Sequence, residues 1–248
     1  MRIKVEGAGA DLVLLHGWGM TADVWNEVAA SLARQFRVHR VELPAASSVP
    51  HALDAMVESI AAAGPPRASV CGWSLGGQLA LRWATMKPAQ VVRLVLIATT
   101  PRFVRGPDWD CGLEPAVFDA FVASLAQDVD ATLQRFILLQ AHGDTAARNV
   151  VRRLRECNAA RGRHDTAALG AGLQLLSNTD LRLDLPGVRQ PVLIVHGEHD
   201  AVVPPGAAAY LQRTLPHAEL EIIAGAAHAP FVAQPQAVAQ RIAKFCHG

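Results

Sequence analysis

The chain has 248 residues, of which 51% are hydrophobic and 18% charged, and its formal net charge at pH 7 is +1. This length and balance fit one large globular domain, or a core with an insertion, and they exclude a disordered or collagen-like protein. A net charge near zero argues against a protein that binds nucleic acid over its whole surface.

The N-terminus and the cysteines indicate the compartment. Charges at Arg2, Lys4 and Glu6 interrupt the first residues, which lack the apolar centre of a signal peptide. The sequence contains no run of about 18 apolar residues, so it does not predict a membrane span. The four cysteines are widely spaced and form no Cys-x-x-Cys pair, which favours free thiols over disulfides and gives no zinc motif. We expect a cytoplasmic protein.

The N-terminal part of the chain alternates predicted strands with predicted helices. Thr21 or Asp23 can cap the first helix, in which apolar residues recur at helical spacing. Such alternation is typical of a mostly parallel sheet with helices on both faces. In chain order the elements are a strand at 2–5, a strand at 11–15, a helix at 24–32, a strand at 37–43 and a helix at 53–63.

A Gly-x-Ser-x-Gly motif at residues 72–76 lies between a predicted strand at 68–71 and a predicted helix at 77–86. Its two glycines let the chain turn sharply and bring strand and helix close together, so Ser74 is held exposed in a strained turn. The amino end of the helix adds free N–H groups and a positive dipole end beside it. Ser74 is therefore the predicted nucleophile.

The rest of the chain contains a long stretch without strands. Residues 91–98 are the most strand-like run and are expected in the middle of the sheet. From about 101 to 185 the apolar residues recur at helical spacing instead. Strands at 192–195 and 220–223 and helices at 207–215 and 238–245 follow. We predict an α/β fold whose core comprises 1–100 and 186–248, with a helical cap insertion at 101–185.

Three side chains that follow predicted strands form a candidate triad. The carboxyl ends of parallel strands meet at one edge of a sheet, where ligands bind. Ser74, Asp200 and His228 appear in the order serine, acid, histidine that this motif requires. The imidazole would take the serine proton, and the carboxylate would orient the imidazole. Glu198 is the alternative acid, because Asp200 could instead serve only to form a turn.

Two backbone N–H groups are the expected oxyanion donors. Leu75 follows the nucleophile, and Trp18 lies in the loop after the strand at 11–15. Removing one such donor typically costs about 3 to 4 kcal/mol of transition-state stabilisation. Trp18 could be a simple core residue, but the flanking Gly17 and Gly19 favour a wall that faces the ligand.

The predicted insertion is locally basic. Residues 135–163 contain seven arginines, at positions 135, 148, 152, 153, 155, 161 and 163, against Asp144 and Glu156, so their net charge is +5. Arg148, Arg152 and Arg155 share one face of a predicted helix. Such a stripe would steer and position an acidic partner. The alternative is an ordinary solvated cap helix.

Several stretches of the chain resemble the α/β-hydrolase superfamily. Within it, the chain is similar over nearly its full length to the pimeloyl-[acyl-carrier protein] methyl ester carboxylesterases of biotin synthesis. A tryptophan occurs both in the loop at residues 16–19, as Trp18, and in the serine motif, as Trp73. This combination is more specific than the pattern of the whole superfamily. The stretches that carry the resemblance are Leu14–Met20, Gly72–Gly77, Arg135–Gln140 and Ala226–Phe231.

The resemblance implies an activity and a set of site residues. Water would release methanol from the methyl ester of a pimeloyl chain on acyl carrier protein and leave the thioester intact. Ser74, Asp200 and His228 would be catalytic, and Trp18 and Leu75 would be the oxyanion donors. The substrate would contact Trp18, Ser74, Leu75, Phe136, Ile137, Leu138, Leu139, Gln140 and His228. The carrier would contact Arg135, Arg148 and Arg152, and Arg155 is added because it shares a helix face with Arg148 and Arg152.

These observations together predict a monomeric serine carboxylesterase that works by acylation and deacylation. Its partner would be acyl carrier protein, with no nucleic acid, membrane, metal or other cofactor required. Two alternatives stay open on the sequence. One is a general short-acyl esterase or lactonase of the same fold, and the other is a hydrolase fold that binds a ligand without catalysis.

Overall fold

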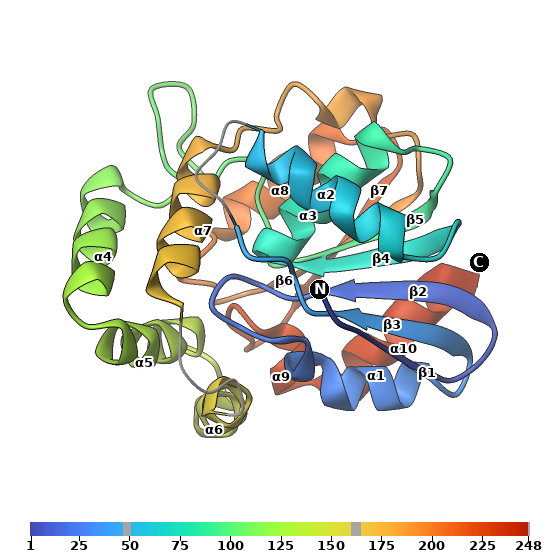
Figure 1. The fold of residues 1–248 in the computed structure, drawn as a ribbon, viewed down its shortest axis with the longest axis horizontal. Helices are drawn as coiled ribbons and strands as arrows, with labels where there is room; N and C mark the ends of the chain where they lie inside the picture. The colour runs from blue at the N-terminus through green and yellow to red at the C-terminus, as the bar shows by residue number, and fades with distance from the viewer. Residues whose placement is uncertain (47–50, 160–164, 248) are drawn as a thin grey trace.

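A seven-stranded sheet forms the centre of the protein (Figure 1). The structure is a computed structural model that describes residues 1–46, 51–159 and 165–247. The strands follow the order β1-β3-β2-β4-β5-β6-β7. All neighbours pair in parallel except β1, which lies antiparallel to β3 at one edge. The strands are Ile3–Glu6 (β1), Ala10–Leu15 (β2), Phe36–Val41 (β3), Ala68–Trp73 (β4), Val91–Ile97 (β5), Val192–Gly197 (β6) and Ala218–Ile223 (β7).

Strand β2 shows why the sheet is buried on both faces. Leu12 and Leu14 pack into the core on one side, whereas Val13 and Leu15 pack into the core on the other. All four side chains are fully buried. Because successive residues of a strand point to opposite faces, a strand covered on both sides has a continuous apolar run rather than an alternating one. The sheet therefore separates two hydrophobic cores.

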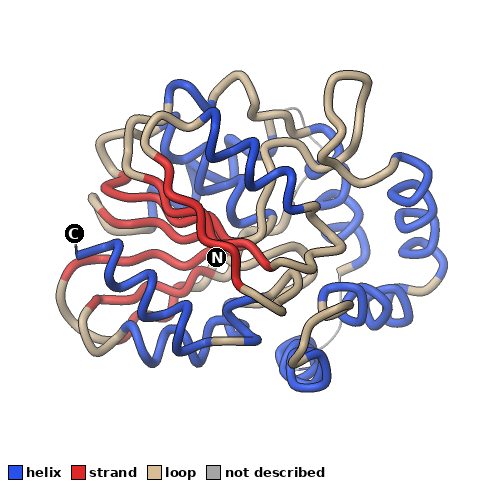
Figure 2. Tube along the Cα trace, turned by 180° about the vertical axis from the view of Figure 1, so that it is seen from behind, coloured by secondary structure: helices blue, strands red, loops and turns tan. Residues whose placement is uncertain are grey.

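Helices cover both faces of the sheet (Figures 1 and 2). Helices α2, α3 and α8 pack into one core, and α1 and α10 pack into the other. Their bounds are Asn26–Leu32 (α1), Ala52–Ala63 (α2), Leu75–Met86 (α3), Pro205–Thr214 (α8) and Pro235–His247 (α10). Three short helices complete this part of the described chain, at Ala22–Trp25 (η1), Leu185–Gly187 (η2) and Pro230–Ala233 (α9).

The chain between β5 and β6 forms four helices in its described residues, which we call the cap helices. They gather beside one end of the sheet (Figure 1). Within the predicted helical insertion, α4 and α5 are separate helices, because Asp128 ends α4 and its side chain accepts a hydrogen bond from Ala131 N at the start of α5. The cap helices are Pro115–Gln127 (α4), Val129–Gln140 (α5), Ala147–Ala159 (α6) and Thr166–Asn178 (α7).

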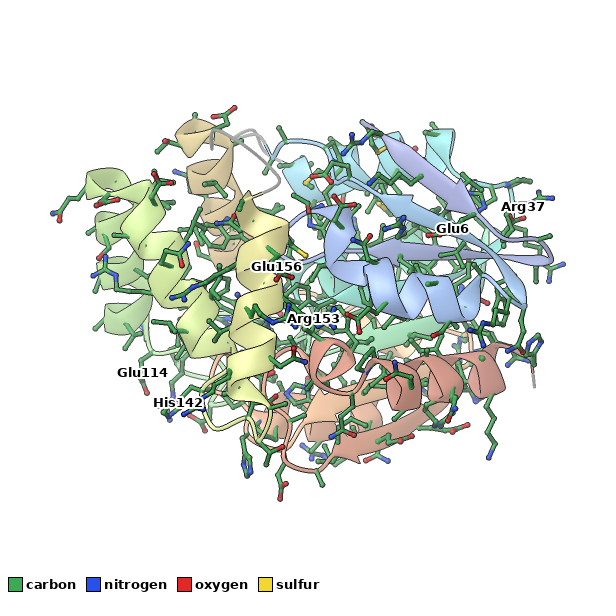
Figure 3. The ribbon with its side chains drawn as sticks, turned by 90° about the horizontal axis from the view of Figure 1, so that it is seen from below. Glu6, Arg37, Glu114, His142, Arg153 and Glu156 are labelled. Atoms are coloured by element: carbon green, nitrogen blue, oxygen red, sulfur yellow. The ribbon has the colours of Figure 1, made fainter. Side chains whose placement is uncertain are left out.

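The cap helices share the two cores of the sheet. Val150 and Leu154 of α6 pack into the core that contains α1 and α10, and Leu173 of α7 packs into the opposite core. Arg153 of α6, which is labelled in Figure 3, also forms an ion pair with Glu27 of α1. The insertion thus continues the packing of the sheet. Its exact limits as a cap unit stay a prediction.

The cysteines and the helices of the described chain have two further properties. Cys71, Cys111, Cys157 and Cys246 are all free thiols. Burial raises the pKa of Cys157 to about 11 and that of Cys246 to about 11, so both thiols are protonated near neutral pH. None of the described helices combines the length and the hydropathy that a membrane span requires.

Candidate active site

Ser74 is the single residue between β4 and α3. The strand runs two residues further than predicted and the helix begins two residues earlier, so the turn is tighter than the sequence indicated. The Ser74 backbone has φ 55° and ψ −118°, which side-chain-bearing residues rarely adopt. Such strain costs on the order of 1–3 kcal/mol and persists only where the surrounding structure imposes it.

The glycines of the motif are required by close backbone contacts. A Cβ atom on Gly72 would lie 2.1 Å from the carbonyl oxygen of Gly76, and one on Gly76 would lie 2.4 Å from that of Leu15. Both distances are far below van der Waals contact. The two glycines therefore allow β4, α3 and the end of β2 to meet at Ser74.

The Ser74 turn is held by hydrogen bonds from neighbouring elements. Ser74 N donates to the carbonyl oxygen of Ile97 at 3.0 Å, at the end of β5. The Thr99 hydroxyl donates to the Ser74 carbonyl oxygen at 2.6 Å. A side chain on Gly77 would collide with Thr99, since its Cβ would lie 2.6 Å from Thr99 Oγ1. Thr99, which the sequence analysis did not single out, thus fixes the turn from the adjacent strand end.

Asp200 and His228 form a buried pair. His228 Nδ1 lies 2.8 Å from Asp200 Oδ2, and the two residues are 0% and 5% exposed. The other carboxylate oxygen accepts hydrogen bonds from Val202 N at 2.9 Å and Val203 N at 2.8 Å. The carboxylate is therefore fixed, and it favours the tautomer in which Nδ1 carries the proton. Nε2 of His228 is buried and has no hydrogen-bond partner among the described residues, so it is available as a base.

The alternative acid lies elsewhere. Glu198 is exposed and its Oε2 accepts a hydrogen bond from Gly225 N at 2.9 Å. His228 is thus paired with Asp200 and not with Glu198.

A second histidine lies against the same carboxylate. His196 Nε2 is 3.3 Å from Asp200 Oδ2 and 2.9 Å from the carbonyl oxygen of Val203. Burial lowers the pKa of His196 because desolvation penalises its charged form. A neutral His196 donates its one N–H, at Nε2, to the Val203 carbonyl oxygen, and it adds no charge that would compete with the His228 imidazolium for the carboxylate.

Trp73 connects the histidine to the serine turn. Its indole N–H donates to the carbonyl oxygen of His228 at 2.8 Å, and its ring centroid lies 5.5 Å from that of His228. Trp73 directly precedes Ser74. The residue before the proposed nucleophile therefore anchors the backbone of the proposed base.

The expected oxyanion donors both lie close to the serine turn. Leu75 is the first residue of α3, where backbone N–H groups have no acceptor within the helix. Trp18 and Leu75 line one cavity together with His16 and Gly17. A Cβ atom on Gly17 would lie only 3.3 Å from Ser74 Cβ, so the loop of Trp18 passes directly beside the serine.

His16 holds this loop in place. Its Nε2 accepts a hydrogen bond from Leu43 N at 3.1 Å, which leaves Nδ1 to donate to the carbonyl oxygen of Gly17 at 2.8 Å. The imidazole thereby ties the loop of Trp18 to the residues that follow β3.

Trp18 also forms one wall of an apolar pocket. Its indole N–H donates to the carbonyl oxygen of Leu169 at 2.9 Å, and its ring packs edge-on against Phe121 and Phe136 at centroid distances of 5.5 and 5.3 Å. The pocket lies between the core and the cap helices. Its lining is entirely apolar and includes Trp18, Phe121, Phe136, Leu139, Leu173 and Val202.

The structure separates the five consecutive residues that were expected to share a substrate wall. Phe136 and Leu139 line the apolar pocket. Ile137 is fully buried in the core on the other side, and Leu138 is 50% exposed. Gln140 is buried, and its carbonyl oxygen accepts a hydrogen bond from His228 N at 3.1 Å. A helix turns about 100° per residue, so five successive side chains cannot face one pocket.

The four arginines proposed for carrier binding are all exposed. Arg135 lies on α5, and Arg148, Arg152 and Arg155 follow one another on α6. Arg152 pairs with Glu156 at 2.8 Å, and Arg155 Nε donates to Gln134 at 2.8 Å. The structure therefore gathers these charges on neighbouring cap helices. The other two counted at the end of the basic stretch, Arg161 and Arg163, lie outside the described residues.

No group of three or more His, Cys, Asp or Glu side chains that could hold a metal ion occurs in the described part of the chain.

Comparison with known proteins identifies the family. Residues 12–241 match the profile of the alpha/beta hydrolase family, and the chain belongs to this family. It is 44% identical over 241 residues to the pimeloyl-[acyl-carrier protein] methyl ester esterase of Nitrosomonas europaea, covering 95% of each chain. It is 43% identical over 250 residues to the protein of that name from Stenotrophomonas maltophilia, covering 99% of this chain and 96% of the relative.

Solved structures share the fold at lower sequence identity. An esterase from Exiguobacterium antarcticum superposes with a TM-score of 0.89 at 19% identity, covering 99% of this chain and 95% of its own. An enol-lactonase from Burkholderia xenovorans superposes with a TM-score of 0.84 at 18% identity, covering 100% of this chain and 96% of its own. At such identities the likeness establishes the α/β-hydrolase fold alone.

Proposed function

We propose that the protein is a serine carboxylesterase that hydrolyses the methyl ester of pimeloyl-[acyl-carrier protein] and releases methanol, in biotin biosynthesis. The observation that carries the chemistry is the buried Asp200–His228 pair, tied through Trp73 to the strained Ser74 turn. The substrate assignment is supported by relatives of 38–44% identity over nearly the whole chain that bear this activity in their names.

In the acylation step, Nε2 of His228 accepts the proton of the Ser74 hydroxyl while Oγ attacks the ester carbonyl carbon. The negative charge that forms on the carbonyl oxygen is stabilised by the N–H groups of Leu75 and Trp18. The intermediate collapses when the imidazolium gives its proton to the methoxy oxygen and methanol leaves. Asp200 stabilises the imidazolium throughout.

Deacylation repeats these roles with water as the nucleophile. His228 takes one proton from water, the resulting hydroxide attacks the acyl-enzyme carbonyl, and Ser74 Oγ leaves with the proton returned by His228. The product is the free acid, which ionises to the carboxylate and releases the second proton of the water to solvent. Turnover consumes only ester and water, so the enzyme returns to its starting state.

The apolar pocket and the arginines support the choice of substrate. Burial of each methylene group of an acyl chain is worth about 0.8 kcal/mol, and the pocket beside Trp18 offers only apolar contacts. The exposed arginines of α5 and α6 suit an acidic carrier protein. The proposal includes a monomeric, cytoplasmic enzyme with residues 101–185 as its cap.

The test is turnover of methyl pimeloyl-[acyl-carrier protein] by the wild type and by Ser74→Ala. We expect methanol release with an intact thioester in the wild type and a loss of about 10³-fold or more in the variant. Ser31→Ala, in α1, which packs into the core opposite to that of α3, is the matched control and should keep full activity. Near-normal hydrolysis by folded Ser74→Ala would refute the mechanism. Hydrolysis of p-nitrophenyl butyrate without turnover of the carrier-bound ester would refute the substrate and leave a general short-acyl esterase.

A further inference from the structure

The turn between α5 and α6, residues 141–146, is hydrogen-bonded to the loop that carries His228. Thr145 N donates to the carbonyl oxygen of Gly225 at 2.8 Å. Ala227 N donates to Asp144 Oδ2 at 2.8 Å, and His228 N donates to the carbonyl oxygen of Gln140 at 3.1 Å. Three residues of the His228 loop are thus bonded to one corner of the cap.

Asp144 has a buried carboxylate in this contact. The residue is 7% exposed, and its two oxygens have different partners. Oδ1 accepts a hydrogen bond from Ala146 N at 2.7 Å, just before α6 begins, and Oδ2 accepts from Ala227 N. The two N–H donors and the amino end of α6 stabilise the negative charge of the carboxylate. The side chain therefore joins the start of a cap helix to the residue before His228.

The composition of the His228 loop gives these bonds weight. The four residues before His228 are Ala224, Gly225, Ala226 and Ala227, none with a side chain larger than a methyl group. Such side chains offer little packing surface, although Ala226 and Ala227 are buried, so backbone hydrogen bonds carry much of the placement of the loop. Ala226 is bonded on the opposite side, where its carbonyl oxygen accepts from His199 N at 2.9 Å.

We propose that Asp144 is a positioning residue for His228. By accepting the Ala227 N–H, it fixes the backbone from which the imidazole projects, so that Nδ1 stays within 2.8 Å of Asp200 Oδ2 and Nε2 stays oriented for proton transfer. The α5–α6 corner of the cap is then part of the catalytic framework. This inference rests on the proposed role of His228 as the base.

The test compares Asp144→Ala with Asp128→Ala. Asp128 is a matched control because it also accepts a backbone N–H at the start of a cap helix, from Ala131 at 2.9 Å, but it is exposed and caps α5 rather than α6. With p-nitrophenyl butyrate, we expect kcat of Asp144→Ala to fall about 10- to 100-fold with KM within about 3-fold of the wild type, as for a slightly misplaced catalytic group. Asp128→Ala should keep kcat within about 2-fold.

Two further readouts separate positioning from general destabilisation. Proton NMR should show the low-field signal of the His228 Nδ1–H shifted or broadened in Asp144→Ala and unchanged in Asp128→Ala. Asp144→Asn retains one acceptor oxygen and should recover part of kcat. If Asp144→Ala does not fold, the same comparison is made with Asp144→Asn. Equal kcat in the Asp144 and Asp128 variants, at equal fraction folded, would overturn the proposal. Failure of the esterase proposal would show separately, as an active Ser74→Ala enzyme.

Discussion

Ser74 illustrates how much of a candidate catalytic site can depend on the absence of a side chain nearby. Its strained backbone persists because Gly72 and Gly76 let three elements meet at close range. The strain itself contributes nothing to stability. It places half-buried Ser74 at the edge of the sheet, where the proposed base and the loop of Trp18 also lie.

Gly76→Ala should damage both the fold and the activity. The new Cβ would lie 2.4 Å from the carbonyl oxygen of Leu15 and 2.6 Å from that of His16, and backbone atoms cannot move aside cheaply. We expect a loss of about 1–3 kcal/mol in the free energy of unfolding and a fall in esterase activity of at least about 10-fold, because the oxyanion loop is displaced.

Gly170→Ala is the matched control for this substitution. It lies within α7, and a Cβ atom there would meet nothing within 4 Å. Because alanine is the better helix former, we expect the free energy of unfolding to rise by about 0.5–1 kcal/mol. Urea unfolding measures both variants, and equal effects at the two glycines would contradict the steric argument.

The individual site residues differ in how far they could be predicted. The motif and the order of the residues after each strand propose Ser74, Asp200 and His228. They do not point to Thr99 or Asp144, because each of these contacts a segment distant in the sequence, which no local pattern reports. The spatial neighbours of the triad become visible only once the sheet is assembled.

At the scale of helices, one ion pair joins α2 to α3. Arg82 donates to both oxygens of Asp54, at 2.7 and 3.0 Å, and its Nη1 lies 3.2 Å from Asp184. The hydrogen bonds from Arg82 lower the pKa of Asp54. The Asp54 and Arg82 side chains are 28% and 27% exposed, so solvent screens the pair only partly.

Arg82→Met should therefore cost about 1 kcal/mol of stability at pH 7. A lowered carboxyl pKa stabilises the fold above the unfolded-state value of about 3.9, and that contribution is lost as the pH falls through the lowered value. The difference in the free energy of unfolding between wild type and variant should thus shrink below about pH 4. Chemical unfolding across pH measures it, with exposed Arg67→Met as the control. A difference that does not change with pH would show that the lost contribution is packing and not charge.

Most helices and strands could be predicted, since burial on both faces gives strands apolar runs and core helices regular apolar spacing. Two features could not. The break at Asp128 depends on a cap that the continuous apolar spacing hides, and the short helix α9 is only four residues long, too short for a periodic pattern. The wall expected over 136–140 was split because helical geometry disperses successive side chains.

At the scale of the molecule, charge is unevenly distributed. The chain carries a net charge of only +1, whereas Arg135, Arg148, Arg152 and Arg155 lie exposed on two adjacent cap helices. A local field of this kind accelerates the docking of an acidic partner and weakens with salt, because the screening length falls from about 30 Å at 0.01 M to about 8 Å at 0.15 M.

The double variant Arg148→Gln/Arg152→Gln should separate carrier docking from chemistry. We expect KM for the carrier-bound ester to rise about 10-fold, the equivalent of about 1.4 kcal/mol, with a weaker dependence on salt than in the wild type. Turnover of p-nitrophenyl butyrate should stay within about 2-fold. The control is the double variant Arg189→Gln/Arg213→Gln, whose two arginines are exposed and lie outside the cap helices. An equal loss on both substrates would count against carrier recognition.

The hydrogen bonds between the α5–α6 corner and the His228 loop bear on how esterases of this family acquire new specificities. An insertion between two strands is a convenient place to exchange helices, since the sheet need not change. Here, however, the proposed base takes part of its support from the inserted segment. Cap helices exchanged from a relative could supply a new substrate pocket. If they lacked an acceptor in place of the Asp144 carboxylate, they would also leave the His228 imidazole misaligned. Selection for substrate range and selection for rate would therefore act on the same few residues.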